Sequence, residues 1–416
     1  MSPAMTTMPR PHPIVRFLRV TGPGLIVMLA DTDVGSIITA GQSGVQWGYQ
    51  LLLMQFVLIP ILYVVQEMTV RLAIFTGRGH GELIRDTFGK FWAYVSAAGL
   101  TVAVAGALLS EFSGVAGIGE LYGLSRFVTL PAAAFLLLLV GLTGRYRRVE
   151  QVAMLFGLFE FAFFIVAYSA HPTGADVLRG AADIPLGNQS YMFLVAANIG
   201  AVIMPWMIFY QQSAIADKRL GPADLGAARV DTAIGAVLTQ LVMAAVLVAA
   251  AAFVKTSDPE RSLGTIGELA SALTPLFGSE LGKFLFSAGV LGAAMVAAIV
   301  SSLALAWGIG EVAGFHRSLE LRPAQAPWFY GVYGACVVGG ALLVAVWPNL
   351  VQLNIAIQVM NALLLPLVLG FLIALGIRAL PEPVRLRGAY KWVVIAVAAV
   401  TCAFGVFGGL NGAVAG

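Results

Sequence analysis

Charged residues are scarce in this chain. Only 11% of its 416 residues are Asp, Glu, Lys or Arg, whereas an average soluble domain has about 25%. Hydrophobic residues make up 59% of the chain, and apolar runs of about 18 residues or more recur along it. One large soluble core does not explain such repeated runs. The composition therefore excludes an ordinary soluble protein and predicts an all-α protein with many transmembrane helices.

Cysteine and histidine are also rare. The two cysteines, Cys336 and Cys402, lie in apolar runs without a Cys-x-x-Cys spacing, so we expect no disulfide framework. The four histidines all lie near expected span ends or loops, which excludes a histidine relay across the membrane. The motifs His-Glu-x-x-His and Gly-x-Ser-x-Gly are absent. These absences argue against a membrane-embedded enzyme, and we expect no cofactor.

The apolar runs predict about eleven transmembrane spans, of which the run at 127–142 is short. The spans begin near residues 13, 49, 93, 127, 149, 189, 226, 282, 329, 351 and 391. With the N-terminus inside, most of the 24 Lys and Arg residues fall on the cytoplasmic side, as the positive-inside rule expects. The exceptions are Arg126, Arg179, Lys255, Arg261 and Lys283. We therefore expect an integral protein of the cell (inner or plasma) membrane, with a cytoplasmic N-terminus and an outside C-terminus.

The chain is expected to form a single transmembrane domain over residues 13–416, after a loose cytoplasmic tail at 1–12. No cleavable signal peptide is expected, because the first apolar run has no small-residue cleavage site. The net charge of +3 reflects membrane orientation rather than binding to nucleic acid. The lipid bilayer is therefore the expected partner, and no obligatory protein partner is evident.

Two apolar spans are interrupted by residues that membrane helices avoid. The first break, at 30–36, contains Asp31, Asp33 and Gly35, and the second, at 200–206, contains Pro205. Glycine permits unusual backbone conformations, and proline lacks the N–H that a helix interior needs. Carboxylates inside a bilayer cost several kcal/mol unless they are paired or hydrated, so by default they mark a functional site.

The positions of the breaks predict how the spans are organised. Breaks in the first and sixth spans are typical of secondary transporters with two inverted repeats, in which the broken helices meet at the middle of the bilayer. The spacing predicts repeats of five helices at about 13–170 and 189–378, followed by an extra helix at about 391–413. The substrate site is then expected where the two breaks meet.

The residues at the breaks carry recognisable motifs. Asp33-Val34-Gly35-Ser36 lies in the first break, and Ala201-Val202-Ile203-Met204-Pro205-Trp206 lies in the second. They resemble the Asp-Pro-Gly-Asn and Ala-x-x-Met-Pro-His motifs of the Nramp (natural resistance-associated macrophage protein) family, proton-coupled divalent metal transporters with the LeuT-like fold. The resemblance extends through the chain, with further matches at Arg71-Leu72, Thr76-Gly77, Leu83, Gln358-Val359 and Pro366.

The departures from the family motifs fall inside the site. Ser36 stands where the family has asparagine, and Trp206 stands where it has histidine. Val34 replaces the proline, and Asp31 is an additional acid. The resemblance therefore implies the fold more strongly than it implies the substrate.

Asp33 is the first candidate for binding a metal ion, because a hard divalent cation needs an anionic oxygen ligand. The resemblance implies that Met204 adds a thioether, which favours Mn²⁺-like transition metals over Mg²⁺ and Ca²⁺. Its alternative role is core packing. The resemblance also implies that Ala201 offers its carbonyl. Ser36 is a weaker oxygen ligand than asparagine, or instead acts through water or caps the second, outer half-helix. Gln358 is a neutral oxygen donor.

Proton movement needs carboxylates in this chain, because an indole cannot carry a proton. The candidate carriers are Glu111, Glu160, Asp31 and Glu311. The resembling family also has a glutamate in the helix of Glu111. Each carrier could instead donate a structural hydrogen bond between helices. Asp31 could also be a second metal ligand or a charge lining the pathway. We assign Gly35, Pro205 and Trp206 to the helix breaks and the gate.

These observations predict a secondary active transporter that imports Mn²⁺-like divalent metal cations by alternating access, with possible proton coupling. The metal ion is then a substrate. One alternative is a site rebuilt for Mg²⁺ or another solute, without coupling. A second alternative is a channel, since broken helices also line pores. Saturable uptake distinguishes a transporter from a channel.

Overall fold

The computed structural model describes residues 17, 19–253, 263, 266–273, 279–346 and 351–415. Every regular element within these residues is a helix, which confirms the predicted all-α class. The expected tail at 1–12 lies outside the described residues. So do Lys255 and Arg261, which were predicted to lie on the outer side of the membrane.

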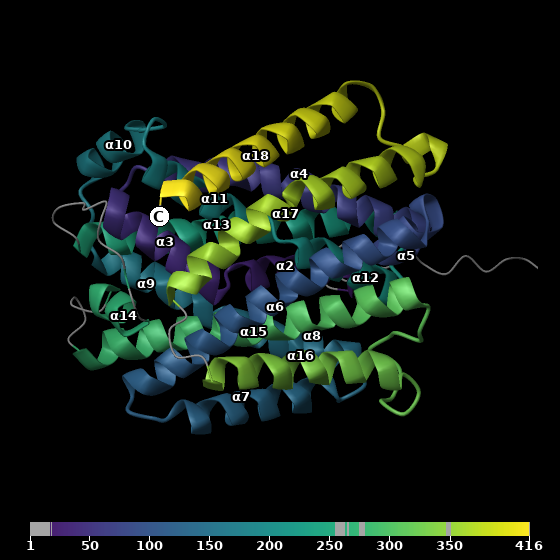
Figure 1. Ribbon diagram of the computed structural model, residues 1–416, viewed down its shortest axis with the longest axis horizontal. Helices are drawn as coiled ribbons and strands as arrows, with labels where there is room; N and C mark the ends of the chain where they lie inside the picture. The colour runs from purple at the N-terminus through teal and green to yellow at the C-terminus, as the bar shows by residue number, and fades with distance from the viewer. Residues whose placement is uncertain are drawn as a thin grey trace, which may run out of the picture.

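Long helices lie side by side in a bundle (Figure 1). Among the described residues, nine helical segments are long and apolar enough to cross a bilayer, and a tenth is the bent pair α2 (Pro23–Asp31) and α3 (Val34–Trp47). The nine are α4 (Leu52–Thr76), α6 (Lys90–Leu121), α8–η1–α9 (Tyr146–Gly157, Leu158–Phe161, Ala162–Ser169), α11–α12 (Gln189–Val202, Pro205–Asp217), η2–α13 (Pro222–Asp224, Leu225–Phe253), α15 (Ser279–Ala313), α16 (Pro327–Val346), α17 (Val351–Arg378) and α18 (Gly388–Ala415).

The expected count of eleven spans depends on α7 (Arg126–Gly141), which has only 16 residues. At about 1.5 Å per residue, a helix of this length covers about 24 Å, less than the hydrocarbon thickness of about 30 Å. Helix length within the described residues thus supports ten spans, and the eleventh stays a prediction.

Short helices lie at the two ends of the bundle. Helix α5 (His80–Phe88) lies at one end, and α10 (Gly174–Ala182) and α14 (Ile266–Leu273) lie at the other (Figure 1). The α5 end carries ion pairs formed by Arg78, Lys218 and Arg317. Basic residues therefore gather at the end that the charge analysis predicts to be cytoplasmic.

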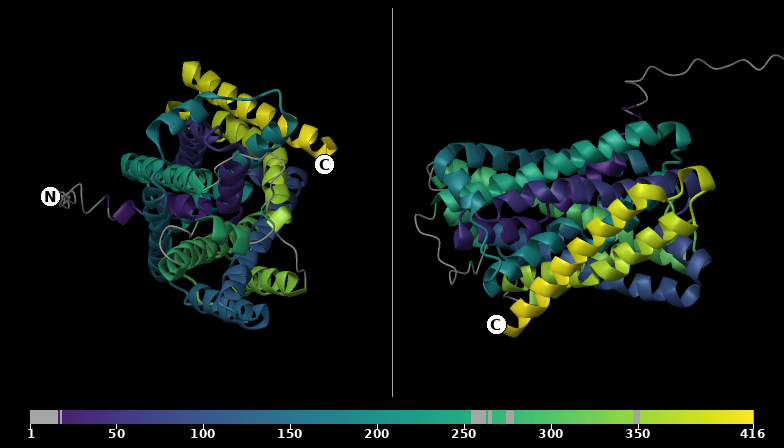
Figure 2. Two further views of the ribbon diagram at one scale, coloured as in Figure 1. Left: turned by 90° about the vertical axis from the view of Figure 1, so that its left-hand side faces the viewer. Right: turned by 90° about the horizontal axis from the view of Figure 1, so that it is seen from above.

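Both predicted helix breaks are confirmed. Helices α2 and α3 are bent by 48° about a break at residues 32–33. Residues 203–204 separate α11 from α12. Helix α3 packs against α11, and α2 packs against α12, so the two breaks meet inside the bundle. Figure 2 shows the purple N-terminal helices enclosed by later ones.

The broken helices are the most enclosed part of the molecule. The most apolar stretch of α11–α12 is 94% buried inside the protein, whereas the corresponding stretch of α18 is only 33% buried. A third interruption was not expected from the sequence: the 3₁₀ segment η1 separates α8 from α9 and contains Glu160. Short 3₁₀ segments within a helix often mark functional positions.

Candidate cation site at the two helix breaks

Asp33 combines a structural role with a free oxygen atom. It is the N-cap of α3, where its Oδ1 accepts a hydrogen bond of 2.6 Å from the backbone N–H of Ser36. The helix N-terminus also stabilises the negative charge of the carboxylate. Its Oδ2 is buried and has no hydrogen-bond partner among the described residues. One carboxylate oxygen is therefore available to a cation.

Ser36 joins the two breaks. Its Oγ donates a hydrogen bond of 3.0 Å to the backbone carbonyl of Ala201, at the end of α11. The expectation that Ser36 caps the second half-helix is wrong, because the cap of α3 is Asp33. The carbonyl of Ala201 keeps a second lone pair, as any carbonyl oxygen does, and so it can still face a cation.

Gln358, on α17, lies between the breaks. A Cβ atom at Gly35 would lie 2.0 Å from the Nε2 of Gln358, and one at Gly200 would lie 1.8 Å from its backbone oxygen. Only glycine permits such close packing at these positions. The Oε1 of Gln358 accepts a hydrogen bond from Asn361. The structure thus turns the amide nitrogen toward α3, in contrast to the expected oxygen donor.

Met204 and Trp206 lie at the start of α12. Met204 is the N-cap, with an extended backbone, and Pro205 follows at the first helical position, where the missing N–H costs nothing. Both Met204 and Trp206 are fully buried. The indole Nε1 of Trp206 has no hydrogen-bond partner among the described residues. The second break therefore presents a thioether residue and an unsatisfied N–H group in the core.

Three further carboxyl groups are buried near the first break. The Oε2 of Glu111, on α6, accepts a hydrogen bond of 3.3 Å from the backbone N–H of Val34. The Oδ2 of Asp31 accepts a hydrogen bond from Thr239 of α13, and Glu160 interacts electrostatically with Asp31 and Thr32. Each of these carboxyl groups has at least one oxygen without a hydrogen-bond partner in the described structure.

These carboxyl groups need a positive partner or a proton. No ion pair within the described residues joins Asp31, Asp33, Glu111 or Glu160 to a basic side chain. Burying an unpaired carboxylate is costly. No cluster of three His, Cys, Asp or Glu side chains in the described part of the chain could hold a metal ion. A cation at the breaks would therefore bind to a mixed set of carboxylate, carbonyl and thioether groups.

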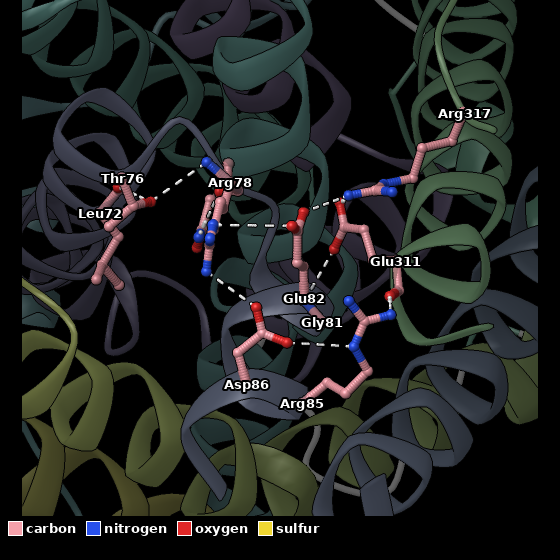
Figure 3. Close-up of polar contacts among 10 residues, drawn as sticks. Leu72, Thr76, Arg78, Gly81, Glu82, Arg85, Asp86, Glu311 and Arg317 are labelled. Carbon is pink, nitrogen blue, oxygen red and sulfur yellow. Dashed lines mark hydrogen bonds and ion pairs between the residues drawn. The ribbon is translucent and has the colours of Figure 1, made fainter. Parts of the chain in front are cut away.

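The structure does not bring Glu311 to the breaks. Its carboxylate accepts hydrogen bonds from Ser213 (2.6 Å) and from the backbone N–H of Gly81 (2.8 Å). Figure 3 shows it in a network with Arg85 and Arg317 at the α5 end. Ser213 lies eight residues after Pro205, about 12 Å along the helix. Within the described residues, Glu311 therefore forms no hydrogen bond with the other candidate proton carriers, Asp31, Glu111 and Glu160.

The contacts of two threonines and the burial of one histidine were not predicted from the sequence. Thr32 and Thr239 place their hydroxyls 2.9 Å apart beside Asp31, and nothing in a lone threonine signals such a contact. His80, near a span end as expected, is buried at the start of α5, where its Nδ1 lies 3.0 Å from the Oε1 of Gln212. Burial lowers the pKa of His80 to about 4, so its ring is neutral at physiological pH.

A family model described as natural resistance-associated macrophage protein-like matches residues 24–409 of this chain. The chain belongs to the Nramp family. Nramp proteins are metal transporters rather than enzymes, and they move the metal as a substrate without a cofactor. Its membership of this family and its many apolar helices show that the chain is an integral membrane protein.

Two relatives of this Nramp chain show the degree of divergence. A divalent metal cation transporter MntH from Aeromonas hydrophila is 31% identical over 351 residues, covering 79% of this chain and 82% of the relative. The MntH of Agrobacterium fabrum is 28% identical over 327 residues, covering 75% and 68%.

Solved structures confirm the LeuT-like fold expected for an Nramp protein. A manganese transporter from Eremococcus coleocola superimposes with a TM-score of 0.75 at 19% identity, covering 96% of this chain and 88% of that one. A nucleobase-cation-symport-1 family transporter has a TM-score of 0.56 at 14% identity, with coverage of 94% and 90%. At these identities the likeness concerns the fold alone.

Proposed function

We propose that this protein imports divalent transition-metal cations of the Mn²⁺ class by alternating access, with Asp33 as the principal ligand. The observation that carries the proposal is the buried Oδ2 of Asp33, which has no partner among the described residues and lies where the two helix breaks meet. A divalent cation supplies the missing positive charge. The manganese transporter with a similar fold and the MntH relatives support this substrate class.

Met204 supports a transition metal over Mg²⁺. A thioether is a soft ligand that Mn²⁺-like metals accept and Mg²⁺ or Ca²⁺ bind poorly. Met204 caps the half-helix that follows the second break, so small rotations of α12 would carry its side chain toward or away from the first break. In this proposal, the Ala201 carbonyl completes the site and Ser36 positions it.

The closed state of the site supports alternating access. Asp33 and Met204 are at most 1% exposed, so both proposed ligands are shielded from water in this structure. A cavity of about 400 Å³ lies at the α5 end, with Glu82, Asp217 and Glu311 among its lining residues. In this proposal, movement of the half-helices α2 and α12 opens the site toward that cavity, through which the ion leaves.

Proton coupling forms part of the proposal because buried carboxyl groups surround the site. Glu111 contacts the backbone of Val34, the residue after Asp33. It is therefore placed to respond when a cation arrives or leaves. Trp206 excludes the histidine route of the resembling family. An inward proton flow with the metal, recorded by a dye inside liposomes, tests this part of the proposal separately from metal uptake.

The first experiment is uptake of Mn²⁺ into proteoliposomes. We expect saturable uptake that falls to background in Asp33→Asn, because asparagine still caps a helix but offers no negative charge. The matched control is Asp176→Asn on α10, an exposed position at the far end of the bundle, which should transport normally. Unchanged uptake in Asp33→Asn would contradict the proposed ligand, and uptake that never saturates would support a channel.

Met204→Ala tests the metal class. If the thioether binds the ion, the variant should lose its preference for Mn²⁺ over Ca²⁺ by about tenfold or more, the effect of one weakened ligand. Met207→Ala is the matched control, because Met207 is equally buried on the same half-helix. Mg²⁺ uptake that is unaffected by Met204→Ala would instead support the alternative of a site rebuilt for Mg²⁺.

A further inference from the structure

A second group of buried oxygen atoms lies beside the first helix break. Asp33 contacts Ser36 and lies near Glu111 of α6, whereas Asp31 and Thr32 contact other elements. The Oγ1 of Thr32 lies 2.9 Å from the Oγ1 of Thr239 on α13, which in turn lies 3.5 Å from the Oδ2 of Asp31.

Glu160 completes this group from the 3₁₀ segment η1. Its carboxyl group is close enough to Thr32 and Asp31 to interact with both electrostatically, and the residue is 0% exposed. The 3₁₀ segment, with about 3.0 residues per turn, interrupts the α-helical span at this residue. Four oxygen-bearing side chains from the first break, α13 and η1 therefore lie together.

Three carboxylate oxygen atoms of this group lack a hydrogen-bond partner in the described structure. Neither oxygen of Glu160 has a well-formed hydrogen bond in the described structure, and the Oδ1 of Asp31 has none either. No basic side chain forms an ion pair with them among the described residues. Two carboxylates that face each other away from water repel strongly. An empty group of this kind is unfavourable, and a bound cation would stabilise it.

We propose that Asp31, Glu160, Thr32 and Thr239 form a second cation site, for a hard divalent cation of the Mg²⁺ class. The donors are all oxygen atoms, which such cations prefer, and the two carboxylates balance a charge of 2+. No thioether belongs to this group. The inference deepens the proposed function by adding a second ion position next to Asp33, and it leaves Glu111 as the carboxyl group for proton movement.

Direct counting of bound ions tests the second site. The purified full-length protein in nanodiscs is dialysed to equilibrium against MgCl₂ or MnCl₂, and bound metal is measured by elemental analysis. We expect about one equivalent of Mg²⁺, held by the all-oxygen site, and about two of Mn²⁺, which accepts both donor sets. Glu160→Gln should abolish Mg²⁺ binding and leave the Asp33 site able to bind Mn²⁺.

Matched variants separate the site from general damage. Glu150 lies in the same span as Glu160, but its carboxylate is paired with Lys218. The variant Glu150→Gln should therefore bind Mg²⁺ as the unmodified protein does. Thr239→Val should weaken Mg²⁺ binding by about tenfold, whereas Thr239→Ser, which keeps the hydroxyl, should not. Mn²⁺ binding in each variant reports whether the protein is folded.

The two proposals fail in different ways. Mn²⁺ binding that depends on Asp33, together with no Mg²⁺ binding, would overturn the second site and leave the proposed function intact. Mg²⁺ binding that survives Glu160→Gln would also overturn it. If the unmodified protein bound neither ion, both proposals would fail.

Discussion

At the level of single residues, Asp33 caps a helix and is also the proposed ion ligand. One oxygen caps α3, and the other has no partner among the described residues. The cap fixes the carboxylate in place, because the side chain cannot turn without losing its bond to Ser36. A fixed ligand loses little conformational entropy on binding. A carboxylate fixed in this way at the start of a helix therefore suits the proposed ion site.

Two glycines near the site should respond differently to alanine. At Gly200 the added methyl group would meet the backbone oxygen of Gln358, whereas at Gly35 it would meet the end of that residue's side chain. We expect Gly35→Ala to cost about 1–3 kcal/mol of stability and Gly200→Ala to cost more, because a backbone moves less easily. Thermal unfolding in detergent measures both.

A second substitution checks the cause of the Gly35 effect. Gln358→Ala removes the clashing side chain, so it should restore stability to Gly35→Ala. It should not restore the stability of Gly200→Ala, because there the added methyl group meets the backbone oxygen of residue 358, which remains in the alanine variant. Equal rescue of both glycine variants would show that the close contact of Gln358 with Gly35 is not the source of the instability.

At the scale of helices, α5 ties separate spans together at its end of the bundle. Its first residues contact α12 through the pair His80 and Gln212, and α15 through the bond from Gly81 to Glu311. An ion pair between Glu82 and Arg317 adds a further link. Because α12 follows the second helix break, these contacts hold one half of a broken helix against the rest of the bundle.

His80 predicts how stability depends on pH. Its pKa is lowered by burial from 6.5 to about 4, so the unfolded chain binds a proton at a pH where the folded protein does not. The stability that depends on neutral His80 is complete above about pH 6.5 and is lost as the pH falls toward about 4. The loss amounts to about 3 kcal/mol at the low end.

The measurement compares unfolding temperatures at pH 7.5 and pH 5. The unmodified protein should lose more stability over this interval than His80→Gln, whose side chain does not titrate. His316→Gln, at an exposed histidine, is the control and should behave as the unmodified protein does. An identical pH dependence in His80→Gln would contradict the assigned protonation state.

At the scale of the whole molecule, the distribution of charge indicates an orientation. Basic side chains gather at the α5 end, in contact with acidic partners such as Asp86 and Glu82. Exposed ion pairs add little to stability, so their concentration at one end is better explained by membrane insertion than by folding. The α5 end is therefore expected to face the cytoplasm.

Cysteine labelling in intact cells tests the orientation and the short helix α7 together. In a background where Cys336 and Cys402 are replaced by alanine, Leu124→Cys and Asp183→Cys should react with an impermeant reagent. Asp86→Cys and Arg145→Cys should react only after the membrane is opened. If α7 does not cross the membrane, Leu124→Cys and Arg145→Cys would report the same side, which would contradict eleven spans.

The membrane class and the two helix breaks could be predicted from the amino-acid sequence alone, and so could Asp33 as the candidate ligand. These features are local, because hydrophobic run length, glycine, proline and a carboxylate in an apolar segment act on their own part of the chain. The family motifs at Asp33 and Met204 added the expected fold. The count of spans was less secure, since α7 is too short for length alone to decide.

Which groups lie close together could not be predicted from the sequence and follows from the packing of the helices. The bond from Ser36 to Ala201 joins residues 165 positions apart, and the contact of Asp31 with Thr239 joins residues 208 positions apart. Likewise, Glu160 lies beside the first break, whereas Glu311 belongs to the network at the α5 end. The physical reason is that these distances depend on how whole helices pack, and helix packing is set by many side chains together rather than by any one motif.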